Sequence, residues 1–496
     1  MVKVHSADTE FGMHPTVHLL TATFFAIWPS VSTSCILSCS SLAAKPYEAQ
    51  RLASNVTKMK AEYEVAVIGS GYGGGIAACR LARAGRKVVV LEKGKEFLPG
   101  DFPNTPSQAL KEIQLNLGHH SDEKEDRNGL YDFSIHDDLV VFKGCGLGGT
   151  SLVNANVSIQ PEPRIFQDSR FPKELQDITK LDADYEQARN MLKPSTVPDP
   201  NKYKKTQVLK KASKAFQEEY KLENDPFKLA EINVNFAEAG YNEQGVWQQP
   251  CTDCGDCVSG CNYSAKNTVA MNYLPDAKYH GAEIYCSIDV IRILPAVDEH
   301  DNPIFNAEGE HRWQIWYRKI GLGRDKFNHD SKEEHIIVDM VVVSGGTLGS
   351  TEIMLRSKEK GLVCSDQVGT CFSGNGDMIG FAYNGTDPVN NVGFGHKLPG
   401  QKEPVGPCIT GIIDARNVWG KDTDLVKDMI FEDGTPPGLV NTAYRAMLAF
   451  ANMTNGVDDN PDDNADQVLR SLGHKATLHT LGVLVMANDD GSGTMN

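Results

Sequence analysis

Residues 65–92 form a strand, a glycine-rich turn, a helix and a second strand, and this unit constrains the fold more than any other part of the chain. Residues 65–68 are apolar and mostly β-branched, which is typical of a buried parallel strand. In the Gly-x-Gly-x-x-Gly that follows, the first glycine permits a tight turn, the second lets the backbone approach a pyrophosphate, and the third lets the helix pack on the strand. The free N–H groups of the helix end would then face the phosphates. The turn residues that we assign to a dinucleotide cofactor are Gly69, Gly71, Tyr72, Gly73 and Gly74.

The second strand of this unit ends on an acid. Residues 88–91 are Val-Val-Val-Leu, and Glu92 follows them. A carboxylate at this place can accept hydrogen bonds from a ribose hydroxyl. A glycine triplet alone is weak evidence, but the strands, the helix and the acid are all in register. The unit predicts a dinucleotide site and leaves NAD and FAD both open.

Composition excludes two classes of partner. The net charge of −16 argues against binding to nucleic acid and to anionic membrane surfaces. No apolar run reaches the ~18 residues of a membrane-spanning helix, so we expect no transmembrane segment. With 496 residues, the chain is long enough for more than one domain.

The first 58 residues resemble a leader. Residues 19–28 are apolar and precede a Ser/Cys-rich stretch, as in a signal peptide, but Asp8 and Glu10 come before them. Met59 offers a later start, which would make the leader spurious. Both interpretations stay open, so localisation is either cytoplasmic or secreted, and we expect residues 1–58 to lie outside the fold.

Two further glycine-rich segments have a residue pattern typical of cofactor-binding turns. Residues 144–154 include Gly144, Gly148 and Gly149, and such a run lets backbone N–H groups approach a flat or anionic ligand, although it is also compatible with a flexible loop. Residues 338–349 read as a strand with a glycine turn, followed by a helix. Three such segments far apart in the chain indicate one long cofactor held by discontinuous pieces.

We therefore expect an α/β fold, with a Rossmann-type cofactor domain built from discontinuous segments and an α+β substrate domain that is incomplete at its C-terminus. Helical periodicity marks residues 182–192 and 206–220. The expected parts are a cofactor domain at 59–160 and 281–380, an inserted part at 161–280, and a substrate domain at 381–496.

Four cysteines are crowded into the inserted part. Their spacing is Cys-x2-Cys-x2-Cys-x3-Cys, as in bacterial ferredoxins, but Asn262 follows instead of proline and no second quartet exists. A 4Fe-4S cluster, a zinc ion, and structural thiols or a disulfide are the open alternatives. A cluster would favour a dehydrogenase that passes electrons to an acceptor over an oxidase that uses oxygen. The candidate ligands are Cys251, Cys254, Cys257 and Cys261.

The fingerprint, Gly-Gly-Thr-Ser-Leu-Val-Asn at 148–154 and Gly-Thr-Leu-Gly-Ser-Thr-Glu-Ile at 346–353 occur in this order. Together they resemble the glucose-methanol-choline (GMC) flavin oxidoreductases, and within them the cholesterol oxidase group. The resemblance implies non-covalent FAD, with Glu92 on the adenosine ribose and the backbone of Val290 at the adenine. It also implies that the 144–157 loop, which includes Asn154, lies against the isoalloxazine.

The resemblance implies a reaction as well. Members of the group oxidise the hydroxyl of a sterol by hydride transfer to the flavin, with oxygen or another acceptor taking the electrons, and a carboxylate shifts the steroid double bond. Residues 429–439 match that carboxylate's segment, with one residue fewer, and make Glu432 the candidate base. An apolar pocket would raise its proton affinity. The alternative is an exposed loop acid beside Asp433.

One part of the family pattern is absent. The catalytic histidine of a His-Pro-Leu-Gly-Gly segment and an asparagine before a proline do not occur, and we do not assign their roles to His474 or His479. We therefore expect a truncated gene product in which oxidation of a sterol or other bulky alcohol is impaired. A flavin and iron–sulfur alcohol dehydrogenase and a non-catalytic FAD- or sterol-binding fragment are the alternatives.

Overall fold

The computed structural model describes residues 51–116, 128–136, 139–167, 171–321, 332–419, 425–445, 448 and 477–495. Most of the expected leader and His474 lie outside these ranges. The described residues belong to one compact unit.

Residues 51–58 correct the expected leader boundary. The Ser54 N–H donates to the carbonyl of Ile284 at 2.7 Å, and the Leu52 N–H donates to the Glu96 carboxylate. Val56 and Met59 pack against the core of the main sheet. The fold therefore begins before residue 59, because these residues find partners that are distant in the sequence.

A six-stranded sheet forms the cofactor domain and has the order β10-β11-β12-β1-β2-β9. Strands β12, β1, β2 and β9 are parallel, and β10, β11 and β12 form an antiparallel meander. The register pairs Val65 with Val88 on one side and with Met340 on the other. The bounds are β1 Glu62–Ile68, β2 Val88–Leu91, β9 Glu283–Tyr285, β10 Ile288–Pro295, β11 Trp313–Lys319 and β12 Glu334–Val343.

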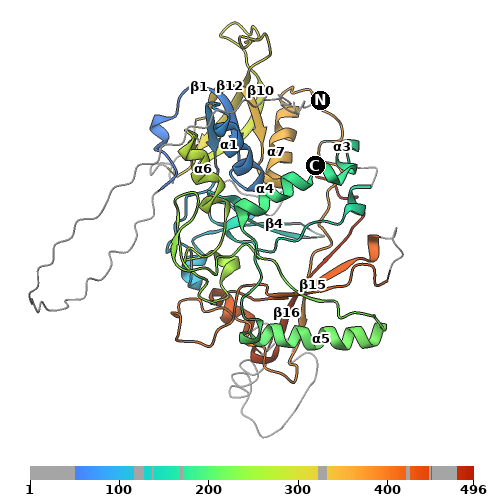
Figure 1. Ribbon diagram of the computed structural model, residues 1–496. Helices are drawn as coiled ribbons and strands as arrows, with labels where there is room; N and C mark the ends of the chain where they lie inside the picture. The colour runs from blue at the N-terminus through green and yellow to red at the C-terminus, as the bar shows by residue number, and fades with distance from the viewer. Residues whose placement is uncertain are drawn as a thin grey trace, which may run out of the picture. The chain divides into compact units, whose positions relative to one another are not determined.

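Helices cover both faces of this sheet (Figure 1). Helices α1 (Tyr72–Arg83) and α6 (Tyr273–Tyr279) pack on the face that carries Val65 and Val67. Helix α7 (Gly346–Glu359) packs on the opposite face, which carries Ala66. Because alternate strand residues point to opposite faces, a strand buried on both sides must be apolar throughout.

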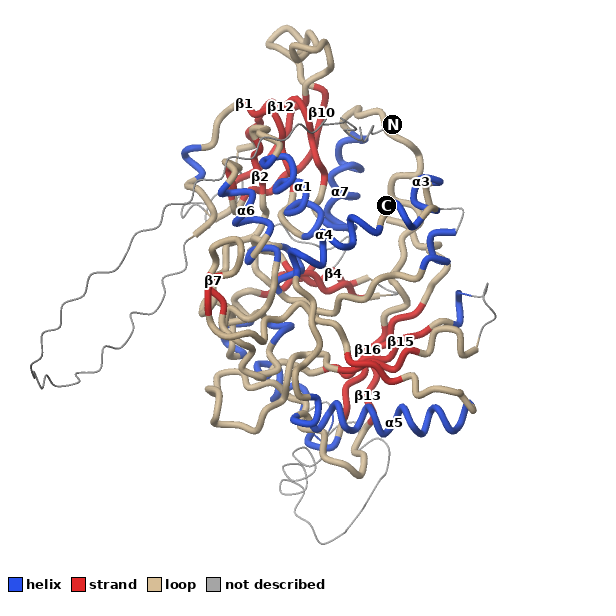
Figure 2. Tube along the Cα trace, in the orientation of Figure 1, coloured by secondary structure: helices blue, strands red, loops and turns tan. Residues whose placement is uncertain are grey.

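A five-stranded antiparallel sheet has the order β13-β16-β15-β14-β6. Helix α5 (Lys204–Tyr220) covers one face of this sheet (Figure 2). Its Leu209 packs with Ile413. The opposite face packs on Val157 and Ile232. The bounds are β6 Phe227–Leu229, β13 Met378–Ala382, β14 Gly411–Asp414, β15 Met429–Gly434 and β16 Leu481–Ala487.

Smaller elements connect the two sheets. The remaining strands form a three-stranded sheet, β3-β4-β5, and a two-stranded hairpin, β7-β8. Their bounds, with the remaining helices, are β3 Ile113–Asn116, β4 Tyr131–Ile135, β5 Val140–Gly144, β7 Gly240–Tyr241, β8 Trp247–Gln248, α2 Pro106–Ala109, α3 Lys173–Gln176 and α4 Asp182–Leu192.

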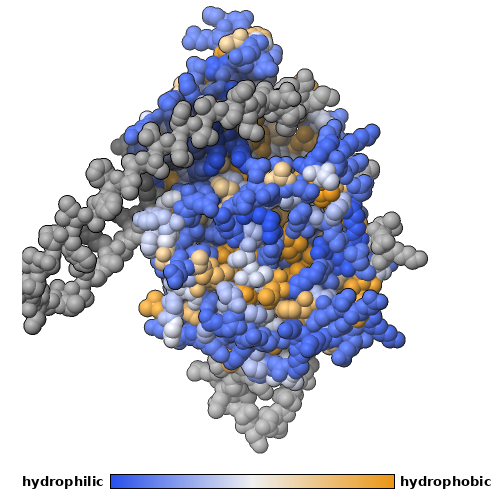
Figure 3. Space-filling view, viewed as in Figure 1, coloured by the Kyte–Doolittle hydropathy of each residue, from blue (hydrophilic) through white to orange (hydrophobic). Residues whose placement is uncertain are grey.

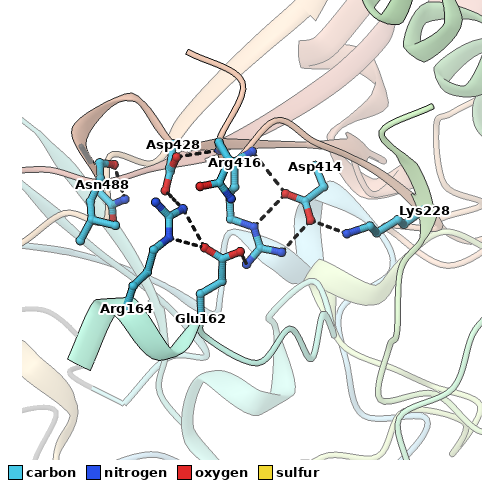
Figure 4. Close-up of polar contacts among 9 residues, drawn as sticks. Glu162, Arg164, Lys228, Asp414, Arg416, Asp428 and Asn488 are labelled. Carbon is cyan, nitrogen blue, oxygen red and sulfur yellow. Dashed lines mark hydrogen bonds and ion pairs between the residues drawn. The ribbon is translucent and has the colours of Figure 1, made fainter. Parts of the chain in front are cut away.

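A charged network fastens the five-stranded sheet to the segment before α3 (Figure 4). Arg416 bonds Asp414 at 2.6 Å and lies 3.9 Å from Glu162, which also pairs with Arg164 at 2.7 Å. Lys228 of β6 reaches Asp414 at 2.7 Å. Burial raises the pKa of Asp414, but hydrogen bonds from Arg416 and Lys228 outweigh this effect and lower the pKa to about 2. The ion pairs thus fix β6 and β14 to one another.

The structure confirms the expected α/β class with a Rossmann-type sheet made from discontinuous segments. The helix expected at 182–192 is α4, and the helix expected at 206–220 begins two residues earlier, at Lys204. The other expected domain boundaries stay predictions. Among the helices of the described ranges, none has both the length and the hydropathy needed to cross a bilayer.

Candidate functional site

The three glycine segments meet at one end of the parallel sheet. Gly69 directly follows β1 and has φ +88°, and a Cβ there would lie 2.3 Å from the carbonyl oxygen of Ser344, in the turn after β12. Gly149 has φ +58°, and a Cβ there would lie 2.8 Å from Gly71 Cα. A side chain at either place would push these turns apart. The sequence-predicted segments therefore come together at the start of α1.

The N-terminus of α1 lacks a side-chain cap at its N-cap position. Its N-cap residue is Gly71, which has no side-chain hydrogen bond, and its first turn contains no acidic residue. Tyr72, Gly73 and Gly74 are the first helical residues. The free N–H groups and the positive end of the helix dipole therefore suit an anion such as a pyrophosphate.

Glu92 lies buried at the carboxyl end of β2, with 5% of its surface exposed. Its carboxylate accepts hydrogen bonds from the main-chain N–H of Ser70 at 3.0 Å and of Gly94 at 2.8 Å. Burial raises the pKa of Glu92, against the hydrogen bonds from Ser70 and Gly94. The Ser70 hydroxyl also accepts from the Gly148 N–H at 2.9 Å, so Glu92 is tied to two of the glycine segments. Its role at the ribose stays a prediction.

The glycine loop after β5 carries Gly144 at its start and Asn154 near its end. The amide of Asn154 donates to the Tyr72 hydroxyl at 3.0 Å. Its Oδ1 atom is buried, and no group in the described ranges donates to it. A buried acceptor without a partner is uncommon in folded proteins and suits a ligand that brings a donor. The residues present therefore fit a flavin dinucleotide laid across this end of the sheet.

Val290 lies two residues into β10, with 5% of its surface exposed. The chain that leads to it runs beside the end of β2, because the Ser287 N–H donates to Gly94 O at 3.1 Å and the Ile288 N–H donates to Glu92 O at 2.9 Å. The structure thus places Val290 near Glu92. The predicted contact of its backbone with adenine is not tested by this arrangement.

Glu432 lies inside the second sheet, which overturns the alternative of an exposed loop acid. It sits in β15 between Ile412 of β14 and Leu484 of β16, and only 1% of its surface is exposed. Its Oε1 atom is buried without a hydrogen-bond partner in the described ranges. Burial, with the charges of Asp433 and Asp377, raises the pKa of Glu432 to about 8.

The adjacent Asp433 points to the opposite face of the sheet. It accepts hydrogen bonds from the N–H groups of Thr410 at 2.6 Å and Gly411 at 2.9 Å, and it pairs with Lys205 of α5 at 3.5 Å. Asp433 and Lys205 are both fully buried. Asp433 is thus held by donors, whereas Glu432 faces the other side, where no described residue donates to its Oε1 atom.

Glu432 shares its face with Ile430, two residues earlier in β15. Ile430 packs in one cluster with Ala155 and Val157, which lie at the end of the 144–157 loop. The buried carboxyl group therefore lies on the face of the second sheet that packs toward the expected flavin loop.

The four cysteines of the inserted segment line one cavity, together with Thr252 and Lys266. All four are free thiols, so the disulfide alternative is not formed. Within the described ranges, no three cysteine, histidine or acidic side chains converge on a position for a single metal ion. The zinc alternative therefore finds no support there, and the iron–sulfur cluster stays a prediction. Burial raises the pKa of Cys251, Cys254 and Cys257.

Lys266 connects this cavity to the glycine loop. Its ammonium group donates to the carbonyl oxygens of Asn154 at 2.7 Å, Leu152 at 3.1 Å and Cys257 at 3.2 Å. Burial lowers the pKa of Lys266 to about 8, although the nearby thiols of Cys257 and Cys261 raise it. Sequence reasoning missed Lys266, and its place directly after the cysteine run was the one available signal.

His479 has no catalytic partner in the described ranges. Its Nδ1 lies 2.9 Å from the main-chain carbonyl oxygen of Gly385, which fixes the ring as a donor to that carbonyl. This agrees with leaving the role of the family's histidine unassigned.

The converging glycine turns, the uncapped helix end and the buried acid after β2 define an α/β dinucleotide-binding protein with a second, antiparallel sheet. The sequence profile of the GMC oxidoreductases matches residues 71–370. The chain belongs to the GMC oxidoreductase family, whose members bind FAD. This confirms the predicted family.

Three relatives bear on the substrate. A cholesterol oxidase of Acinetobacter baumannii is 26% identical over 341 residues, covering 66% of this chain and 56% of the relative. A cholesterol oxidase of Mycobacterium tuberculosis (strain ATCC 25618 / H37Rv) is 24% identical over 414 residues, covering 79% and 65%. A long-chain-alcohol oxidase of Arabidopsis thaliana is 27% identical over 323 residues, covering 64% and 37%. The chain thus spans less than two thirds of the length of these relatives.

Proposed function

We propose that this chain binds FAD and takes part in the oxidation of the hydroxyl group of a sterol or another bulky alcohol. The observation that carries the proposal is the meeting of three glycine segments at the uncapped start of α1. Flavin, when bound, accepts a hydride from the carbon that bears the hydroxyl.

The chain's own residues would position the cofactor. The first N–H groups of α1 hold the pyrophosphate, and Glu92 accepts from a ribose hydroxyl. The 144–157 loop lies against the ring system, where the free Oδ1 atom of Asn154 accepts a hydrogen bond. Tyr72 keeps the Asn154 side chain in place by accepting a hydrogen bond from its amide nitrogen.

A sterol is the favoured substrate class because of Glu432. Simple oxidation of a long-chain alcohol needs no additional proton-transferring carboxyl group on this face. Movement of a steroid double bond does need one, because a proton must leave one carbon and return to another. A carboxyl group with a pKa of about 8 can hold and release that proton near neutral pH. Apolar residues also gather across the face drawn in Figure 3, between the six-stranded sheet and α5, as a bulky apolar substrate would need.

The choice between oxygen and another electron acceptor belongs to the same proposal. The relatives named above are oxidases, which favours oxygen. A non-catalytic FAD-binding protein is the competing function.

An anaerobic reduction assay tests the proposal. The chain is loaded with FAD, oxygen is removed, and cholesterol, a long-chain primary alcohol or buffer is added while the visible flavin absorption is followed. We expect bleaching with cholesterol, with a smaller rate for the primary alcohol. Retained FAD with no bleaching by any alcohol would replace the proposal with the non-catalytic function, and faster bleaching by the primary alcohol would overturn the sterol assignment.

A further inference from the structure

The cavity lined by the four cysteines is not used by the proposed alcohol oxidation. Nothing in hydride transfer to a flavin or in proton transfer by Glu432 requires four thiols on one short loop. The loop nevertheless brings all four side chains to one cavity, although they lie on a stretch that contains little regular secondary structure.

We propose that this cavity is the binding site of a 4Fe-4S cluster ligated by Cys251, Cys254, Cys257 and Cys261. A single zinc ion needs its thiolates about 2.3 Å away from one point, and no three ligands in the described ranges converge in that way. A cluster of several iron and sulfide ions is wider, so it takes thiolates that face a common space without meeting at one point.

The position of Cys261 explains how the ferredoxin spacing can serve a single cluster. In two-cluster ferredoxins with this spacing, the last cysteine of the run ligates the other cluster, and this chain has no second quartet. Here Cys261 lines the same cavity as the other three. One cluster can therefore use all four thiolates of the run.

The loop is held in place before any ligand binds. The Asp256 carboxylate accepts from the N–H groups of Gly438 at 2.7 Å and Gly395 at 2.9 Å. Asp253 accepts from the Tyr203 hydroxyl at 2.8 Å and also pairs with Lys202. Acidic side chains thus fix the loop from both sides, which lowers the entropic cost of assembling four ligands.

Polar groups around the cavity suit an anionic cluster. Four thiolates give a 4Fe-4S centre a net negative charge, and Lys266 brings a buried positive charge whose hydrogen bonds all go to main-chain carbonyls. No carboxylate in the described ranges neutralises Lys266. Two N–H groups already lie near sulfur, with Cys408 N at 3.4 Å from Cys257 Sγ and Asp253 N at 3.5 Å from Cys251 Sγ. Such donors stabilise cluster-bound sulfur.

The hydroxyl of Thr252 adds a free polar group at this cavity. Its oxygen is buried and has no hydrogen-bond partner among the described residues. A buried hydroxyl without a partner is costly, and a sulfide or thiolate would give it an acceptor.

Reconstitution of the full chain tests the proposal. The protein is incubated without oxygen with ferrous iron and sulfide, desalted, and assayed for iron and acid-labile sulfide, with an electron paramagnetic resonance spectrum after dithionite reduction. We expect about four iron and four sulfide ions per chain and the signal of a reduced cluster. Bound iron without sulfide, one zinc ion per chain in a parallel incubation, or a Cys254–Cys257 disulfide in the purified protein would each overturn the proposal.

Matched variants locate the cluster. Cys254→Ser should lose most of the iron and the sulfide, whereas Cys364→Ser, which changes a cysteine beyond α7, should keep both. FAD retention and circular dichroism report on folding of each variant. If Cys254→Ser does not fold, alkylation of the native thiols before reconstitution replaces it and should block uptake. Equal uptake in the blocked and unblocked protein would overturn the assignment.

Discussion

Replacement of Glu432 by glutamine should stabilise the protein in alkaline solution and have little effect in acid. The carboxyl group is 1% exposed, its Oε1 atom has no partner in the described ranges, and Asp433 and Asp377 are the charged groups that act on it. Glutamine has nearly the same shape and cannot ionise. The variant therefore removes the cost of a buried charge and changes little else.

The magnitude follows from the pKa of Glu432. The folded-state value is about 8 against an ordinary value of 4.5, so the folded chain holds this proton more tightly than the unfolded chain does. The resulting stabilisation is complete below pH 4.5 and is lost as the pH rises through about 8. At about 1.4 kcal/mol per tenfold change in proton affinity, the loss is up to about 5 kcal/mol.

Urea unfolding followed by tryptophan fluorescence measures this difference. We expect the free energy of unfolding of Glu432→Gln to exceed that of the unmodified chain by several kcal/mol at about pH 9, and by far less at about pH 5. Glu299→Gln, at an exposed loop position, is the matched control and should show no such trend. A difference that does not change with pH would refute the buried, unpaired carboxyl group.

Two other substitutions test the packing of the site. Gly149→Val places a side chain 2.8 Å from Gly71 Cα at a positive φ, so it should lower the free energy of unfolding by about 1–3 kcal/mol and abolish FAD retention. The control Gly240→Val, which has no atom within 4 Å of its Cβ, should retain FAD. Equal retention by both variants would show that the glycine contact is not needed. Lys205→Met leaves Asp433 as a buried charge without its cation and should cost about 3–5 kcal/mol in urea unfolding. A loss below about 1 kcal/mol would mean that the ion pair does not hold α5 to β15.

Local pattern accounts for what the sequence could predict. The unit at 65–92 specifies its own strands and helix, because a short apolar run, a glycine turn and an apolar helical stripe leave one arrangement. The α4 bounds follow from the same periodicity. Even the meeting of the three glycine segments could be expected, since each has the form of a cofactor turn.

Contacts between distant segments account for what could not be predicted. Glu432 and Asp433 are adjacent carboxylates in the same sequence context, so the sequence does not show which face of the sheet each one occupies. The pairing of β15 with β14 and β16 decides this. Lys205 lies on a helix rich in charged residues, so the sequence favours a solvent-exposed side chain. In the fold, packing of this helix on the sheet buries it. Lys266 gives no local sign of its three carbonyl acceptors.

The central claim is that the converging glycine segments hold FAD. The full chain, freed of cofactor, is titrated with FAD, and the quenching of flavin fluorescence measures binding directly. NAD is then added as a competitor. We expect saturation at about one FAD per chain that excess NAD does not displace. Binding that does not saturate, or displacement of FAD by NAD, would contradict the account.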